Sequence, residues 1–133
     1  PADGDALIAD NHECLNLRYP GVAEFQWRLM TQDGPKRFRV TGRYETDDGD
    51  VLTDWALGGN GITLKPVFEV SEHIKAGRLV PVAVATPPEP IQMACLFTHR
   101  RGQDPKSRLF MDFMIERIGA FVRDGAGGDQ LPR

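Results

Sequence analysis

The chain has 133 residues and a mass of 14.8 kDa, which allows one compact domain and argues against two independently cored domains. With 41% hydrophobic residues, 26% charged residues and a net charge of −3, the chain has the composition of a globular protein, not of collagen, a coiled coil or a nucleic-acid coat. No run approaches the ~18 consecutive apolar residues that cross a bilayer, and the first residues lack the pattern of a signal peptide. We therefore expect a cytoplasmic protein that does not associate with membranes.

The N-terminal third predicts a short helix, a strand and a β-hairpin. Ala6–Ala9 can form one or two helical turns capped by Asp5, and residues 14–17 suit a short strand. Residues 25–31 and 36–44 both alternate apolar and polar side chains, which is the period of a half-buried strand. Because a Gly-Pro turn separates the two alternating runs, we expect them to pair as a hairpin.

A second helix is predicted directly after a run of acids at 46–50, since acids at a helix N-terminus interact favourably with its dipole. Its apolar face contains Val51, Leu52, Trp55 and Ala56. The glycines of 58–61 then end the helix. They resemble the start of a dinucleotide-binding fingerprint, but the third glycine of that motif would fall at Leu64, so we interpret them as a helix C-cap.

Two strands and a third helix are expected next. Ile62–Leu64 is short, apolar and typical of a buried strand. Ser71 is a suitable N-cap for a helix over 72–76, and Gly77 is suited to the position that follows a helix. Residues 79–85 are predicted to form another strand.

The C-terminal part predicts a crossing segment, a strand and a long helix. The prolines of 87–90 favour an extended segment that we expect to be a hinge, and residues 91–98 are apolar enough for a strand covered on both faces. Asp104 and Pro105 are suited to the N-cap and first position of the last helix, and the chain from Asp124 onward is expected to be frayed. A wide apolar stripe on that helix contains Leu109, Phe110, Phe113, Met114, Ile118 and Phe121.

Residues of the types that catalyse reactions or bind metals are scattered along the sequence. No nucleophile elbow, metal-ligand spacing or CxxC motif includes any of Ser71, Ser107, His12, His73, His99, Cys14 and Cys95. We therefore expect no enzyme, no metal and no cofactor, and we interpret both cysteines as buried free thiols.

The densest acidic cluster contains Asp47, Asp48, Asp50 and Asp54. Helix capping is the preferred interpretation. Two functional alternatives stay open: the amides at the helix N-terminus could bind a carboxylate or another anion, or the first three acids could hold a divalent metal in an enzyme.

Four arginines could share one face of the hairpin, namely Arg28, Arg37, Arg39 and Arg43. A nucleic-acid platform would need aromatic side chains on that same face. Because the alternation places the aromatic residues on the opposite face, we predict that the arginines form a solvated surface.

An ordered series of motifs resembles one protein family. Residues 7–15 read Leu-Ile-Ala-Asp-Asn-His-Glu-Cys-Leu, a hairpin with Trp27 follows, and residues 46–66 read Thr-Asp-Asp-Gly-Asp-Val-Leu-Thr-Asp-Trp-Ala-Leu-Gly-Gly-Asn-Gly-Ile-Thr-Leu-Lys-Pro. Gly-Arg-Leu-Val-Pro-Val at 77–82 and Phe-Met-Asp-Phe at 110–113 continue the series. The series resembles the effector-binding, or substrate-binding, domain of LysR-type transcriptional regulators.

This resemblance, over roughly residues 5 to 122, implies an α/β fold of the two-lobed periplasmic-binding-protein-like kind (type 2). Residues 1–86 would form the second lobe, residues 87–123 would be the crossover strand and C-terminal helix returning to the first lobe, and residues 124–133 would be a flexible tail. In the family a helix-turn-helix near the N-terminus binds DNA. That module and the opening of the first lobe are absent from this chain, which begins at Pro1, so we expect the chain to come from a longer or processed polypeptide.

The resemblance also implies a site for a small effector in the cleft between the lobes, lined by Thr46, Asp47, Asp48, Gly49, Pro66, Val67 and Phe68. The family often has asparagine where Asp47 stands. A carboxylate at that position disfavours a carboxylate effector unless a cation or a nearby arginine compensates.

The leading hypothesis is therefore a ligand-sensing, non-catalytic domain of a LysR-type regulator, and the alternative is a freestanding small-molecule binding protein that does not bind DNA. We also predict a homodimer or a higher homo-oligomer. The reason is that the strand expected at 91–98 is apolar on both faces and needs to be covered.

Overall fold

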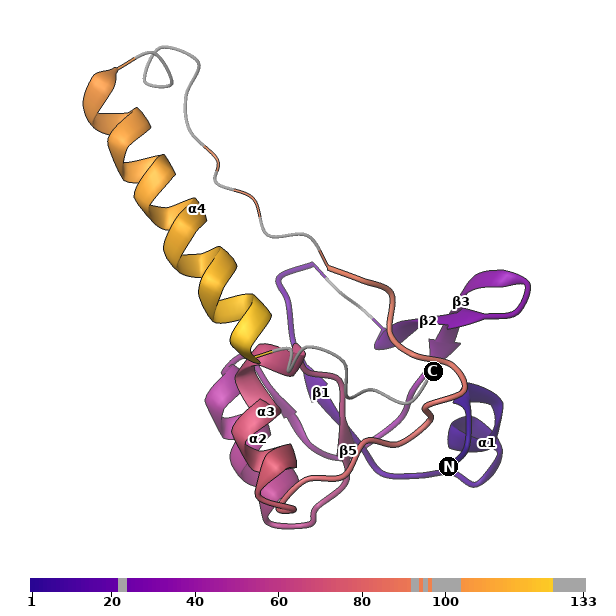
Figure 1. The fold of residues 1–133 in the computed structure, drawn as a ribbon. Helices are drawn as coiled ribbons and strands as arrows, with labels where there is room; N and C mark the ends of the chain where they lie inside the picture. The colour runs from indigo at the N-terminus through magenta and orange to yellow at the C-terminus, as the bar shows by residue number, and fades with distance from the viewer. Residues whose placement is uncertain (22–23, 92–93, 95, 97–103, 126–133) are drawn as a thin grey trace.

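The computed structural model describes residues 1–21, 24–91, 94, 96 and 104–125, with the side chains of the last helix placed as far as Val122. A three-stranded parallel sheet lies at the centre of the body, in the order β4-β1-β5 (Figure 1). The central strand β1 is Cys14–Leu17, and its edge neighbours are β4 (Glu45–Thr46) and β5 (Ile62–Thr63). In register, Leu17 pairs with Thr46 and Leu15 pairs with Thr63.

Two helices follow the edge strands. Helix α2 (Gly49–Leu57) comes after β4, and helix α3 (Val67–Lys75) comes after β5. Helix α2 contacts all three strands and buries Leu52 almost completely. This strand-then-helix order is typical of α/β folds with a parallel sheet.

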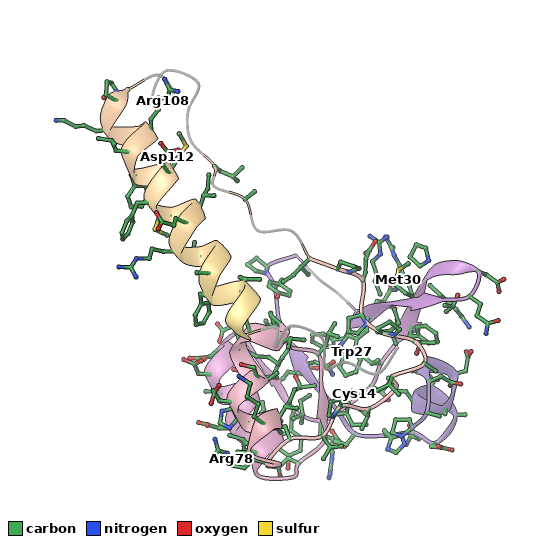
Figure 2. All side chains as sticks on the ribbon, viewed as in Figure 1. Cys14, Trp27, Met30, Arg78, Arg108 and Asp112 are labelled. Atoms are coloured by element: carbon green, nitrogen blue, oxygen red, sulfur yellow. The ribbon has the colours of Figure 1, made fainter. Side chains whose placement is uncertain are left out.

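The predicted hairpin is confirmed as β2 (Gln26–Thr31) and β3 (Gly34–Arg39). Trp27 and Phe38 lie directly opposite each other on its inner face. The hairpin therefore contributes its aromatic side chains to the main core, which contains Leu7, Cys14, Trp27, Leu29, Phe38 and Val40. Figure 2 labels Cys14 of β1 and Trp27 of the hairpin inside the body.

The second hairpin strand was predicted to run over 36–44, but it ends at Arg39. From Thr41 onward the backbone bonds to the parallel sheet instead: the carbonyl oxygens of Thr41 and Tyr44 accept hydrogen bonds from the amides of Cys14 and Asn16. The alternating pattern continues past the point at which the strand changes its partner, which is why the pattern overestimated the length of the hairpin.

The first helix, α1 (Gly4–Ala9), begins two residues before the predicted start and is capped by Asp3 instead of Asp5. The Asp3 carboxylate accepts a hydrogen bond from the amide of Ala6 at 2.8 Å. Asp5 lies within the first turn and forms an ion pair with Lys36 of the hairpin, at 2.8 Å.

Helix α3 corrects the prediction of a helix over 72–76 with Ser71 as its N-cap. The helix begins at Val67, directly after Pro66, and Ser71 lies buried within it. Val67, Val70 and Ile74 are spaced along one helical face, and this apolar spacing extends the helix towards its N-terminus. Gly77 follows the helix with a φ of +68°, as predicted for its C-terminal end.

Residues 79–85 do not form the predicted strand. Val80, Val82 and Val84 are exposed, and Ala83 has a φ of +52°, which interrupts an extended strand. The amides of Ala83 and Ala85 instead donate to the carbonyl oxygens of Pro1 and Ala2.

The last helix, α4 (Pro105–Gly125), starts at the predicted residue, and the Asp104 carboxylate accepts a hydrogen bond from the amide of Lys106. It extends away from the body, and its labelled residues Arg108 and Asp112 lie at the distant end (Figures 1 and 2). Its apolar stripe is largely uncovered, with Leu109, Phe110, Phe113 and Phe121 all more than half exposed.

Several expectations fall on parts of the chain that the structure does not describe: most of the strand predicted at 91–98, Cys95, His99 and the tail after Gly125. Of the strand, Ile91, Ala94 and Leu96 are described, and all three are exposed and outside any strand. Within the described ranges, no helix is long and apolar enough to cross a membrane.

Candidate effector site at the edge of the parallel sheet

The three parallel strands end at the same edge of the sheet, and their carboxyl ends define the candidate site. Ligands of open α/β sheets bind at this edge, because the loops that leave neighbouring strands face each other there. The predicted residues Thr46 to Gly49 run from the last residue of β4 to the first of α2, and Pro66 to Phe68 include the residue before α3 and its first two residues. The fold thus brings two groups that are about twenty positions apart in the sequence to the same edge.

Asp48 lies at the start of α2 as its N-cap. Its carboxylate accepts hydrogen bonds from the amides of Asp50 and Val51, at 2.8 and 3.3 Å. The hydroxyl of Thr46 accepts a hydrogen bond from the amide of Asp48 at 3.1 Å. These bonds confirm the helix-capping interpretation of the acidic cluster, and they leave Asp47 as an exposed carboxylate at the edge.

Lys65 joins the two groups of site residues, and the sequence analysis did not select it. Its side chain is only 7% exposed, and its ammonium forms an ion pair with Glu69 in the first turn of α3. The same ammonium donates a hydrogen bond to the carbonyl oxygen of Gly49 at 3.1 Å. A buried cation therefore connects the N-termini of α2 and α3.

Phe68 lies in the first turn of α3. Its ring packs edge-on against Phe121 of α4, with 5.9 Å between the ring centroids. This aromatic contact is part of the packing of α4 on α3, and it connects a predicted site residue to the C-terminal helix.

A pocket of about 350 Å³ lies between β1 and the hairpin, and none of the seven predicted site residues is among its lining residues. Two of its lining residues lie next to the candidate site, since Leu17 pairs with Thr46 and Leu64 directly follows β5. Most of its lining is apolar or aromatic. The lining residues are Leu15, Leu17, Tyr19, Glu24, Phe25, Gln26, Trp27, Arg28, Arg37, Leu52 and Leu64.

The sequence analysis missed this pocket for a structural reason. No function was predicted for Tyr19, and residues 25–31, which include Phe25 and Trp27, were assigned only to a half-buried strand. The available signal was the position of Tyr19 two residues after a buried strand, where the loops of a parallel sheet bind ligands. The position of Tyr19 indicates a ligand site only when the order of the strands in the sheet is known.

The titratable groups of the interior are few. Burial, followed by the nearby Glu13 carboxylate, raises the pKa of the Cys14 thiol from 9.0 to about 11, so this thiol stays protonated at neutral pH. Cys14 is thus a buried free cysteine, as predicted. In the described part of the chain no group of three or more histidine, cysteine, aspartate or glutamate side chains converges.

Comparisons with known proteins agree with this architecture. The chain is 32% identical over 91 residues to the HTH-type transcriptional regulator DmlR of Escherichia coli, covering 66% of this chain and 28% of that protein. It is 25% identical over 109 residues to the regulator CrgA of Neisseria meningitidis, covering 81% of this chain and 36% of CrgA. The chain therefore spans about a third of the length of these relatives.

Among solved structures, the full-length virulence activator AphB of Vibrio cholerae matches with a TM-score of 0.68 and 29% identity, over 88% of this chain and 39% of AphB. CrgA matches with a TM-score of 0.67 over 90% of this chain and 40% of CrgA, and at 22% identity it supports the fold alone. The architecture is thus the periplasmic-binding-protein-like α/β fold of LysR regulatory domains. The family model described as "LysR substrate binding domain" matches residues 8–119, so the chain belongs to the LysR substrate-binding domain family.

Proposed function

We propose that this chain is the ligand-sensing domain of a LysR-type, DNA-binding transcriptional regulator and that it binds a small effector at the carboxyl edge of the β4-β1-β5 sheet. The family match over residues 8–119 carries the proposal. The two loops and two helix N-termini that meet at one edge of the sheet support it, and a pocket lies beside them at Leu17 and Leu64.

In this proposal the residues Thr46, Asp47, Asp48, Gly49, Pro66, Val67 and Phe68 form one wall of an interlobe cleft. The segment that would cross to the first lobe begins after residue 86. The backbone at residues 83–86 lies beside the N-terminal residues: Pro1 and Ala2 accept hydrogen bonds from Ala83 and Ala85, and the amide of Gly4 donates to the Thr86 hydroxyl at 2.7 Å. Two chain segments side by side are what a hinge between two lobes needs.

The protein regulates by binding and does not catalyse a reaction, and it functions in the cytoplasm. An effector can shift such a regulator only if it binds the two conformations with different affinities. DNA contacts would be made by a helix-turn-helix outside this chain, because the chain covers about a third of its relatives.

A homodimer, or a larger homo-oligomer, completes the proposal. The exposed aromatic residues Phe110 and Phe113 on α4 support it, because apolar surface of this kind is normally covered by protein. Light scattering on the purified protein should report at least a dimer. A monodisperse monomer would contradict this part.

The first experiment is to sequence the source locus upstream of Pro1 over roughly one to two hundred codons, about one domain. A helix-turn-helix followed by a first α/β lobe supports the regulator. The full-length product should then shift a DNA fragment from its own promoter, with an affinity that changes when effector is added. A start codon or an unrelated domain at that place would instead favour a freestanding binding protein.

A further inference from the structure

The pocket between β1 and the hairpin carries one positive charge that the described part of the chain does not neutralise. We infer that this pocket binds the ring of a small aromatic carboxylate and that Arg37 binds the carboxylate group. The inference rests on the proposed function and specifies the chemical class of the effector.

The first argument is the character of the walls. Tyr19, Phe25 and Trp27 line the pocket together with Leu17 and Leu64. Aromatic walls favour a planar ring, because offset and edge-on contacts between rings add to the energy of apolar burial. A volume of about 350 Å³ suits a single-ring molecule, since it lies at the lower end of small-molecule pockets.

The second argument is an arrangement of like charges. Arg28 and Arg37 line the pocket and lie directly opposite each other in the β2–β3 register. Like charges at opposed positions of a hairpin are destabilising unless they are neutralised. Glu89 neutralises Arg28, with 3.0 Å between Arg28 Nε and Glu89 Oε2.

No described carboxylate lies within ion-pair distance of Arg37. Glu24, the one acid in the pocket lining, already pairs with Arg39 at 3.0 Å. Arg37 is therefore available to an anion, and its guanidinium can bind a carboxylate through two parallel hydrogen bonds.

The same walls disfavour other classes of ligand. A small dicarboxylate would place its second charge against Leu17, Phe25 and Leu64, and an unpaired buried charge is costly. A cationic ligand would face the unneutralised Arg37. A ligand with one carboxylate on an aromatic ring can place the ring against the apolar walls and the carboxylate beside Arg37.

The test is a calorimetric titration of the purified protein with benzoate, phenylacetate and 3-phenylpropionate, each beside its neutral amide. We expect saturable one-to-one binding of at least one acid and binding of its amide that is about tenfold weaker, as the loss of a charged hydrogen bond predicts. Arg37→Gln should weaken binding of the acid about tenfold and change binding of the amide less than about twofold. Arg37→Lys should restore part of the loss.

The matched control is Arg43→Gln, which removes the same charge from the exposed partner of Glu13, outside the pocket lining. It should leave both affinities unchanged. Circular dichroism and the unfolding midpoint establish that the Arg37 variants are folded, which is expected because Arg37 is exposed. Equal losses in Arg37→Gln and Arg43→Gln would overturn the role of Arg37.

A parallel thermal-shift screen with succinate, tartrate, amino acids and neutral sugars separates this inference from the proposed function. If one of these ligands stabilises the protein and no phenyl carboxylate binds, the aromatic class is wrong while effector sensing stands. If no compound of any class binds, both proposals fail.

Discussion

The ammonium of Lys65 lies 3.1 Å from the carbonyl oxygen of Gly49, so the end of β5 is joined to the first turn of α2 across sixteen positions of sequence. Because the same ammonium pairs with Glu69, Lys65 positions both helix N-termini of the candidate site. A buried cation in such a place stabilises the fold only while its partners remain.

Lys65→Met should therefore lower the free energy of unfolding by about 1–3 kcal/mol, because the Gly49 carbonyl loses one of its two side-chain donors and Glu69 loses its ion pair. The measurement is urea denaturation. The control is Lys75→Met, whose exposed pair with Glu72 should contribute less than about 1 kcal/mol. Equal effects of the two substitutions would show that Lys65 does not hold the helices.

Gly42 allows the segment that follows β3 to lie close to the backbone of β1. A Cβ atom at this position would lie 1.8 Å from the carbonyl oxygen of Cys14, which is backbone and cannot move aside easily. Gly42→Ala should cost about 3 kcal/mol or more, at the level of other substitutions that strain the backbone. Gly59→Ala is the comparison, because its Cβ meets no atom within 4 Å and only the positive φ costs about 1 kcal/mol.

Asp48 and Asp47 are adjacent acids with different roles. Asp48→Ala removes the acceptor of two helix amides and should destabilise the protein by about 1 kcal/mol, the usual cost of losing an N-cap. Asp47→Ala should leave the thermal midpoint nearly unchanged, because Asp47 is exposed. Thermal unfolding of both variants under one buffer condition measures the difference. A midpoint lowered equally by both would contradict the capping role.

Thr63 carries a buried hydroxyl oxygen without a hydrogen-bond partner among the described residues. Thr63→Val replaces it with a methyl group of similar shape and should raise the free energy of unfolding by about 1 kcal/mol, since a buried unpaired polar group is costly. Thr53→Val is the opposite case, because the Thr53 hydroxyl donates to the Gly49 carbonyl, and that variant should be less stable than the parent. Chemical denaturation of both variants measures whether the free energy of unfolding rises or falls relative to the parent chain.

The raised pKa of Cys14 predicts a loss of stability in alkali. The unfolded thiol releases its proton near pH 9.0, whereas the folded thiol retains it until about pH 11. Between these values the folded state binds more protons than the unfolded state, so the stability contributed by Cys14 falls as pH rises, by at most ~1.4 kcal/mol per pH unit. Urea titrations from pH 8 to 10.5 should show a shallower decline for Cys14→Ala than for the parent chain. Parallel declines would contradict the shift.

The sequence determined the elements whose signals are local. The hairpin, the capped start of α2, the glycine after α3 and the first turn of α4 were predicted because alternation, helix caps and turn residues act over a few positions. The ordered motifs also identified the family.

The tertiary structure alone decided which chain segments meet. Strand β3 ends earlier than predicted because Thr41 and Tyr44 pair with β1. Residues 79–85 form no strand because their backbone pairs with the N-terminal residues. The tertiary structure also brought Lys65 to Gly49, and it showed that Arg37, which is exposed as predicted, is one of the residues that line a pocket. Periodicity reports which face of an element is apolar, but the partner of that face is chosen by contacts between positions far apart in the sequence.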